Sequence, residues 1–185
     1  MINKSIKLII LDRDGVINYD SPDYIKSPEE WHPIPGSLEA IAQLNRAGFA
    51  VVIATNQSGV GRGYFSLSTL QAIHQKMHDA LSDCGGKIDK IYFCPHEPET
   101  HCDCRKPKAG LFDQIAKDYA VDWSHVYCVG DSVRDMQIGL SFGCKNILVL
   151  TGNGKQTLNA ELNWQAIKVC DDLAAAANWI IANQK

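Results

Sequence analysis

The chain has 185 residues, of which 45% are hydrophobic and 21% are charged, and its formal net charge is −3. This length and composition predict one globular domain, over residues 1–185, that buries its own core without disulfides. A slightly acidic chain offers no electrostatic basis for binding nucleic acid or a membrane surface. We therefore expect a monomer whose partner is a small molecule.

The N-terminal segment predicts a cytoplasmic protein. It lacks an apolar run followed by a small-residue cleavage site, and no segment approaches the roughly 18 apolar residues of a membrane span. The seven cysteines are therefore expected to be reduced, with metal binding as the first alternative to disulfides. Four of them, Cys84, Cys128, Cys144 and Cys170, are expected to be small buried hydrophobes.

The first motif follows an apolar run at residues 8–11, which predicts a buried parallel strand. Asp12 and Asp14 come directly after this strand, and Gly15 follows them. Two carboxylates at the carboxyl end of a strand repel each other, so the pattern favours a Mg²⁺ site or an acid/base pair. A loop that the two acids only cap is an equally good interpretation of this motif alone.

The next segment, residues 19–35, contains four prolines. They exclude a long regular helix and predict an ordered flap over the end of the first strand. Candidates for contact with a substrate in this flap are Asp20, Ser21, Pro22 and Asp23. Its two carboxylates fit solvated turn positions equally well.

Residues 37–47 place apolar side chains at helical spacing and predict a helix that ends before Gly48. A second strand, beginning at residue 50, runs into four polar residues: Thr55, Asn56, Gln57 and Ser58. Their hydroxyl and amide groups suit an anion at the carboxyl end of the strand. The alternative is a polar turn in which these side chains cap backbone groups.

Residues 66–82 predict a helix, with Ser68 and Gln71 at the spacing of a capping box. We expect Met77 in the core and both His74 and His78 on the surface. A short third strand is predicted at residues 90–94.

The segment after this strand holds Cys94, His96, Cys102 and Cys104 within eleven residues. Four such ligands predict a closed tetrahedral Zn²⁺ site of the structural type. His101 is a possible replacement for His96, which we prefer because it pairs with Cys94 as Cys102 pairs with Cys104. A loop with incidental cysteines, or a redox disulfide, is the alternative.

Arg105 and Lys106 follow the cysteine loop directly, and residues 109–120 predict a helix with Pro107 in its first turn. An anion at a helix N-terminus gains from the helix dipole and here also from both cations. We therefore interpret Arg105 and Lys106 as a phosphate clamp. A solvated basic run is the alternative.

A fourth strand, at residues 126–130, again ends in an acid, Asp131, with Asp135 four residues later. We expect both carboxylates on one side of the next helical turn, although Asp131 also fits an N-cap. The rest of the chain predicts a helix to about residue 142, strands at 146–150 and 168–170, and a helix at 172–182. This alternation predicts an α/β fold with a doubly wound, mostly parallel sheet and helices on both faces.

Four motifs in order resemble those of the haloacid dehalogenase superfamily of aspartyl-phosphate phosphatases: Asp12-Arg-Asp-Gly-Val, Thr55, Lys106 and Gly130-Asp131-Ser-Val-Arg-Asp135. The cysteine loop that runs into Arg-Lys-Pro is similar to the zinc-containing branch of histidinol phosphatases and heptose bisphosphate phosphatases. The resemblance covers almost the whole chain. It implies a Rossmann-like domain without a large cap domain, whose place the zinc-binding loop takes.

The resemblance also implies the catalytic roles. Asp12 would be the nucleophile and Asp14 the acid/base, while Asp12, the Asp14 backbone carbonyl and Asp131 would bind catalytic Mg²⁺. Thr55 and Lys106 would hold the transferring phosphoryl group. Asp135 would orient Asp131 or Lys106 rather than bind the metal.

The implied substrate is a small sugar phosphate. Asn56, Gln57 and Ser58 would line the surroundings of the phosphoryl group, and Arg105 would recognise a second anionic or polar part of the substrate. The implied reaction is hydrolysis of the C7 phosphate of a heptose 1,7-bisphosphate, a step toward the lipopolysaccharide core, and histidinol phosphate is the alternative substrate. A non-catalytic phosphate-binding protein is less favoured, because a binder needs neither a nucleophile nor an acid.

Overall fold

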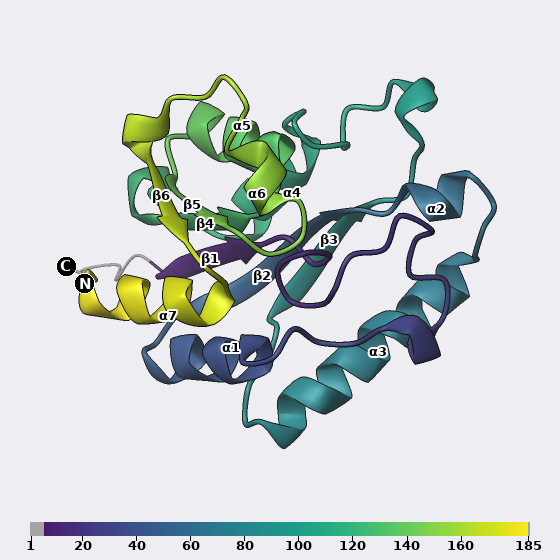
Figure 1. The fold of residues 1–185 in the computed structure, drawn as a ribbon, viewed down its shortest axis with the longest axis horizontal. Coiled ribbons are helices and arrows are strands. Elements are labelled where there is room, and N and C mark those ends of the chain that lie inside the picture. Colours follow the sequence, from purple (N-terminus) through teal and green to yellow (C-terminus); the bar gives the residue numbers. More distant parts are fainter. Residues whose placement is uncertain (1–5, 185) are drawn as a thin grey trace.

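The computed structural model describes residues 6–184 and centres on a six-stranded, wholly parallel sheet (Figure 1). The strands are β1 (Leu8–Leu11), β2 (Ala50–Asn56), β3 (Lys90–Cys94), β4 (Tyr127–Gly130), β5 (Lys145–Val149) and β6 (Ile167–Cys170). Their order is β3-β2-β1-β4-β5-β6, so the chain reverses its winding direction between β1 and β4. Ligands of such sheets bind outside this switch point, at the carboxyl ends of the strands.

Helices cover both faces of the sheet (Figure 1). One face carries α1 (Ser37–Arg46), α3 (Leu67–Asp83) and α7 (Leu173–Ala182), and the other carries α4 (Gly110–Asp118) and α5 (Val133–Ser141). Two single turns, α2 (Ser58–Gly61) and α6 (Gly154–Thr157), follow the ends of β2 and β5. The predicted doubly wound α/β fold is confirmed. Within residues 6–184, no helix is long and apolar enough to cross a membrane.

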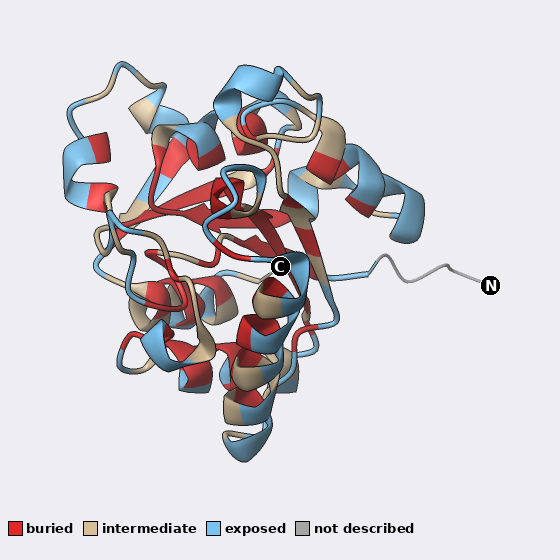
Figure 2. Cartoon of the chain, turned by 90° about the vertical axis from the view of Figure 1, so that its right-hand side faces the viewer, coloured by how far each residue is buried: buried red, intermediate tan, exposed pale blue. Residues whose placement is uncertain are grey.

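The core consists of two layers because successive strand residues point to opposite faces. In β1, Ile9 and Leu11 pack with α1, α3 and α7, whereas Leu8 and Ile10 pack with α4 and α5. All four side chains are at most 1% exposed. Figure 2 shows the same pattern across the sheet, with buried strands and helices that expose only their outer sides. This explains why the strands read as continuous apolar runs rather than as alternating ones.

Two helices begin within one residue of their predicted positions, but the predicted details of their first turns are wrong. The N-cap of α3 is Ser66, whose side chain accepts a hydrogen bond from the Thr69 amide at 3.1 Å, so Ser68 and Gln71 form no capping box. Helix α4 begins only at Gly110, three residues after Pro107, and the Lys106–Pro107 peptide bond is cis. Pro107 therefore belongs to the connection that positions Lys106, and not to the first turn of the helix.

The buried face of α3 also differs from the expectation. Met77 is fully buried, as predicted, but His74 is only 8% exposed, so its predicted surface position is wrong. His74 lies on the same helical face as Leu70, Ile73 and Met77. A polar group inside the protein supplies its partner, as described below.

Candidate active site

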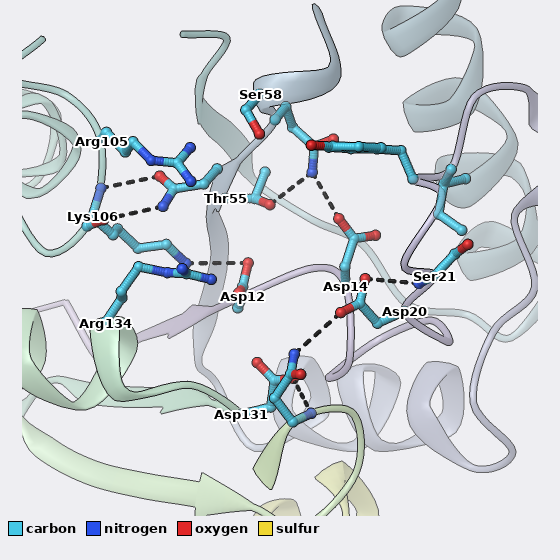
Figure 3. Close-up of a pocket in the computed structure, with 15 residues that line it drawn as sticks. Asp12, Asp14, Asp20, Ser21, Thr55, Ser58, Arg105, Lys106, Asp131 and Arg134 are labelled. Atoms are coloured by element: carbon cyan, nitrogen blue, oxygen red, sulfur yellow. Dashed lines mark hydrogen bonds and ion pairs between the residues drawn. The ribbon is translucent and has the colours of Figure 1, made fainter. Parts of the chain in front are cut away.

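A pocket opens at the carboxyl edge of the sheet, where β1, β2 and β4 end (Figure 3). The residues that line it are Asp12, Asp14, Asp20, Ser21, Tyr24, Ile25, Thr55, Asn56, Gln57, Ser58, Arg105, Lys106, Asp131, Arg134 and Asn153. They come from segments that are far apart in the sequence. The parallel topology brings them together, because it places all strand ends at one edge.

All the predicted catalytic and substrate-binding residues except two line this pocket. Pro22 and Asp23 instead line a neighbouring hollow together with Tyr24, Lys26 and Tyr64. Sequence reasoning also missed four lining residues, which are Tyr24, Ile25, Arg134 and Asn153. Arg134 lies inside the motif from Asp131 to Asp135, and Asn153 follows the end of β5, so their positions carried a signal.

Asp12 is held at the end of β1 by its own backbone, since its amide donates to the Val129 carbonyl at 3.0 Å. Lys106 Nζ lies 3.2 Å from Asp12 Oδ1 and also donates to the Ala54 carbonyl at 2.6 Å. This lysine is only 3% exposed. Burial by itself lowers the pKa of Lys106, but the carboxylates of Asp12 and Asp135 raise it above its usual range. Lys106 is therefore a fixed positive charge beside Asp12.

Asp135 orients Lys106. Its Oδ1 accepts from Lys106 Nζ at 2.6 Å, and its Oδ2 accepts from the Ser132 amide at 3.1 Å and the Ser132 hydroxyl at 2.6 Å. The contact with the Ser132 amide belongs to the capping box at the start of α5, and the hydroxyl contact adds to it. A Cβ on Gly130 would lie 2.2 Å from the Asp135 Cβ, so only glycine permits this packing. Both Asp135 oxygens are engaged by the protein.

Asp12, Asp131 and Asp135 form a cluster whose ligand atoms all lie within 4.8 Å of one another. Burial first, and then the neighbouring carboxylates, raise the pKa of Asp131 to about 7. Burial likewise raises the pKa of Asp12 to about 6, although the Lys106 charge opposes this shift. Crowded carboxylate oxygens that resist ionisation fit a hard divalent cation such as Mg²⁺, which would relieve their repulsion.

The loop after β5 holds Asp131 in place. Asp131 Oδ2 accepts from the Asn153 amide at 2.7 Å and from Asn153 Nδ2 at 3.2 Å. Two glycines allow this approach, because a Cβ on either Gly15 or Gly152 would lie 2.2 Å from Asp131 Oδ2. Asn153 Nδ2 also reaches Asp20 Oδ2 at 3.2 Å, so one side chain connects the Asp131 carboxylate to the flap.

The Asp14 carboxylate accepts four hydrogen bonds. Its Oδ1 takes Arg13 Nε at 3.0 Å and Asn18 Nδ2 at 2.8 Å, and its Oδ2 takes Arg13 Nη2 at 2.9 Å and Gln57 Nε2 at 2.8 Å. Burial raises the pKa of Asp14, but the Arg13 charge and these donors outweigh it and lower the pKa below its ordinary value. These donors and the Arg13 charge therefore favour the ionised form of Asp14.

Three cations form the opposite wall of the pocket (Figure 3). Lys106 is buried, whereas Arg105 is half-buried and Arg134 is exposed to solvent. Burial and the charge of Arg134 lower the pKa of Arg105. No ion pair joins either arginine to a carboxylate in the part of the chain that the structure describes. Two guanidinium groups without acidic partners fit an anionic ligand.

The cysteine loop brings four ligand atoms together beside the pocket. Cys94 Sγ lies 3.0 Å from Cys104 Sγ and 3.5 Å from Cys102 Sγ, and His96 Nδ1 lies 3.3 Å from Cys104 Sγ. All four atoms are within 4.8 Å of one another. Sulfur atoms around a tetrahedral Zn²⁺ are separated by roughly 3.8 Å, so the donor set and its spacing fit that ion. His101 is exposed and is not a member of the cluster.

The same loop supports Arg105. Arg105 Nη1 donates to the His96 carbonyl at 3.4 Å, and Lys108 Nζ donates to the carbonyls of His101 and Cys102 at 3.0 and 2.8 Å. On the other side, the Gly61 amide donates to the Pro95 carbonyl at 2.8 Å. The position of Arg105 in the pocket therefore depends on the cysteine loop.

A family model, curated proteins and a solved structure that resemble this chain all point to one group of hydrolases. Residues 103–176 match the HAD-hydrolase-like family model. The D-glycero-beta-D-manno-heptose-1,7-bisphosphate 7-phosphatase of Bordetella bronchiseptica is 52% identical over 95% of this chain and 98% of its own. The enzyme of the same name from Pseudomonas putida is 49% identical over 95% of this chain and 100% of its own. The crystal structure of the B. bronchiseptica D,D-heptose 1,7-bisphosphate phosphatase with magnesium and phosphate has a TM-score of 0.93, covering 96% of this chain and 99% of that one.

Proposed function

Since this chain belongs to the family of D-glycero-β-D-manno-heptose 1,7-bisphosphate 7-phosphatases within the haloacid dehalogenase-like hydrolases, we propose that it hydrolyses the C7 phosphate of that heptose bisphosphate. The observation that carries the proposal is the position of Asp12. It lies 3.2 Å from a buried lysine and belongs to a cluster of carboxylates that fits Mg²⁺, at the base of a solvent-accessible pocket. A nucleophile with a fixed cation beside it is what attack on a phosphoryl group requires.

The reaction proceeds in two displacements at phosphorus. In the first, an Asp12 oxygen attacks phosphorus while the bond from phosphorus to the C7 oxygen breaks, and Asp14 donates a proton to that oxygen. An anionic phosphoryl group in the pocket favours the protonated form of Asp14. In the second, Asp14 takes a proton from water, whose oxygen attacks the aspartyl-phosphate and releases phosphate and Asp12.

Two further residues hold the transferring group. Lys106 places its ammonium beside Asp12, where it offsets the negative charge of the phosphoryl oxygens. Thr55 accepts a hydrogen bond from Gln57 Nε2 at 2.9 Å, which leaves its hydroxyl hydrogen free to donate to a phosphoryl oxygen. Asn56 fixes the connection before Lys106, since its Oδ1 accepts from the Lys106 amide at 3.0 Å.

Two metal ions complete the proposal. Asp12, the Asp14 backbone carbonyl and Asp131 would hold Mg²⁺, which supplies positive charge against the repulsion between the Asp12 carboxylate and the phosphoryl oxygens. Cys94, His96, Cys102 and Cys104 would hold Zn²⁺ in a site with four protein ligands and therefore a structural role. Its effect on catalysis would be indirect, through the support that the loop gives to Arg105.

The wall of cations favours a substrate with two phosphates. Arg105 and Arg134 lie beyond Lys106 and are suited to the C1 phosphate, which a simple monophosphate lacks. Histidinol phosphate, the alternative substrate, carries an amine and an imidazole at its far end and gains nothing from these two cations.

A side-by-side assay of the two compounds tests the proposal. We expect kcat/KM for heptose 1,7-bisphosphate to exceed that for histidinol phosphate by at least about 100-fold, a difference of about 2.7 kcal/mol, with the C1 phosphate left intact. As a control, the double variant Arg105→Ala/Arg134→Ala should lose most of this preference while retaining turnover of small monophosphates. If histidinol phosphate is the better substrate, the heptose assignment is wrong.

A further inference from the structure

Behind Asp14 lies a buried polar chain that the two displacements do not use. Arg13 stands between the two aspartates of the first motif and is only 1% exposed, although it carries a full charge. His74 reaches it from α3 on one face of the sheet and is 8% exposed. Neither residue lines the pocket. A buried guanidinium is costly unless its donors find acceptors, so each of its contacts matters for the arrangement.

The Arg13 guanidinium distributes its donors among three side chains. Nε and Nη2 form a bidentate pair with the two Asp14 oxygens at 3.0 and 2.9 Å. Nη2 also donates to Gln57 Oε1 at 3.0 Å, and Nη1 lies 3.3 Å from His74 Nε2. The planar fork of the guanidinium fixes the plane of the carboxylate that it holds. His74 thereby anchors the end of the fork that points away from Asp14.

The contact with Arg13 defines the protonation state and the tautomer of His74. Arginine offers only donors, so His74 Nε2 must accept, and the ring is neutral with its proton on Nδ1. Burial and the Arg13 charge agree with this, because they lower the pKa of His74 to about 3. The ring is also packed edge-on against Phe93, with centroids 6.1 Å apart. His74 is therefore a permanent acceptor in a fixed position.

We propose that Arg13 and His74 are positioning residues that aim the Asp14 carboxyl group at the leaving-group oxygen. The inference rests on the proposed function, since it assumes that Asp14 is the acid/base. Phosphoryl transfer to Asp12 needs a proton for the leaving oxygen of a sugar, and a misaligned acid delivers that proton poorly. Loss of the His74 acceptor frees one end of the Arg13 fork and lets Asp14 turn.

Leaving-group dependence separates positioning of the acid from general structural damage. A sugar alkoxide needs protonation as it leaves, whereas p-nitrophenolate is a weak base and leaves without a proton. For each variant, the ratio of kcat/KM for heptose 1,7-bisphosphate to kcat/KM for p-nitrophenyl phosphate is measured with Mg²⁺ present. This ratio does not depend on how much of the preparation is folded, because both values scale with the same active fraction.

The test compares two substitutions at one position. His74→Phe keeps a ring against Phe93 but removes the acceptor, whereas the side-chain oxygen in His74→Gln occupies the place of Nε2. We expect His74→Phe to lower the ratio about tenfold through kcat with KM for the bisphosphate unchanged, and His74→Gln to restore most of it. His74→Leu replaces His74→Phe if the latter does not fold. His78→Phe, one helical turn further along α3, is the matched control and should leave the ratio unchanged.

Asp14→Asn is measured in parallel and should lower the ratio by at least about 100-fold. If Asp14→Asn lowers the ratio and His74→Phe does not, the positioning role is wrong and the proposed function is unaffected. If Asp14→Asn leaves the ratio unchanged, the acid/base assignment itself fails. A fall of both kcat/KM values by the same factor in His74→Phe would also overturn the inference, because it indicates structural damage without an effect on proton transfer.

Discussion

Replacement of Asp135 by asparagine would test how the protein holds Lys106. Asp135 is 2% exposed, and its two oxygens accept from Lys106 Nζ on one side and from the Ser132 amide and hydroxyl on the other. Asparagine has nearly the same volume but only one side-chain oxygen. Whichever way the amide turns, it presents an NH₂ group to a donor, either the Lys106 ammonium or the Ser132 amide.

The expected cost follows from the contacts that remain. Removing one partner of a buried ion pair typically costs about 3–5 kcal/mol, because the other charge is left without compensation. Lys106 keeps Asp12 at 3.2 Å and the Ala54 carbonyl at 2.6 Å, so a value near the lower end, about 3 kcal/mol, is expected for Asp135→Asn. Turnover should fall as well, because a lysine drawn toward Asp12 alone binds the phosphoryl group less well.

Urea unfolding followed by circular dichroism measures this effect. With a slope of roughly 2 kcal/mol per molar urea, a loss of about 3 kcal/mol lowers the midpoint by roughly 1.5 M. The matched control is Ser132→Ala, which removes the serine hydroxyl from the capping box but leaves the pair between Lys106 and Asp135 intact, and it should cost about 1 kcal/mol. A loss below about 1 kcal/mol in Asp135→Asn would refute the view that this pair compensates the buried lysine.

Three other predictions concern the nucleophile and the two metal sites. Asp12→Asn should abolish turnover without loss of fold, because it removes the nucleophile at nearly constant volume; phosphate release at the wild-type rate would exclude the aspartyl-phosphate route. Cys102→Ser should lose bound zinc on dialysis against a weak chelator and should raise KM and lower kcat together through Arg105; full zinc content with full activity would contradict the four-ligand site. In metal-free protein, burial raises the pKa of Asp12 to about 6 and that of Asp131 to about 7, whereas both carboxyl groups lose their protons at about pH 4 in the unfolded chain. The free energy of unfolding should therefore fall as pH rises from about 4 to about 7 and then level off. Thermal unfolding in EDTA should show this decline and Mg²⁺ should reduce it, whereas identical profiles with and without Mg²⁺ would argue against a metal at these carboxylates.

The amino-acid sequence by itself determined the architecture and the approximate place of the site. Each strand is a short apolar run, and Asp12, Thr55 and Asp131 follow such runs directly. In a parallel sheet the carboxyl ends of all strands lie at one edge, so residues that directly follow the strands are brought together there. The cysteine cluster was equally accessible, since Cys94 to Cys104 are so near in sequence that any compact loop brings their side chains together. These features depend on backbone periodicity and on short spacings, which the chain carries locally.

Only the tertiary structure decided which side chains point into the pocket and which contact each other inside the protein. The spacing of His74 in the sequence is compatible with a surface position. Its burial depends on Arg13, which contacts it from a distant part of the chain, and no local spacing reveals that partner. Arg134 lines the pocket because the first turn of α5 directs it there, and Asn153 lines it because of the path that the loop takes after β5. Pro22 and Asp23 do not line the pocket, because they form the tip of a turn that the Tyr24 amide closes by donating to the Ser21 carbonyl at 3.1 Å. Side-chain direction and loop path depend on long-range packing, which no local pattern in the sequence specifies.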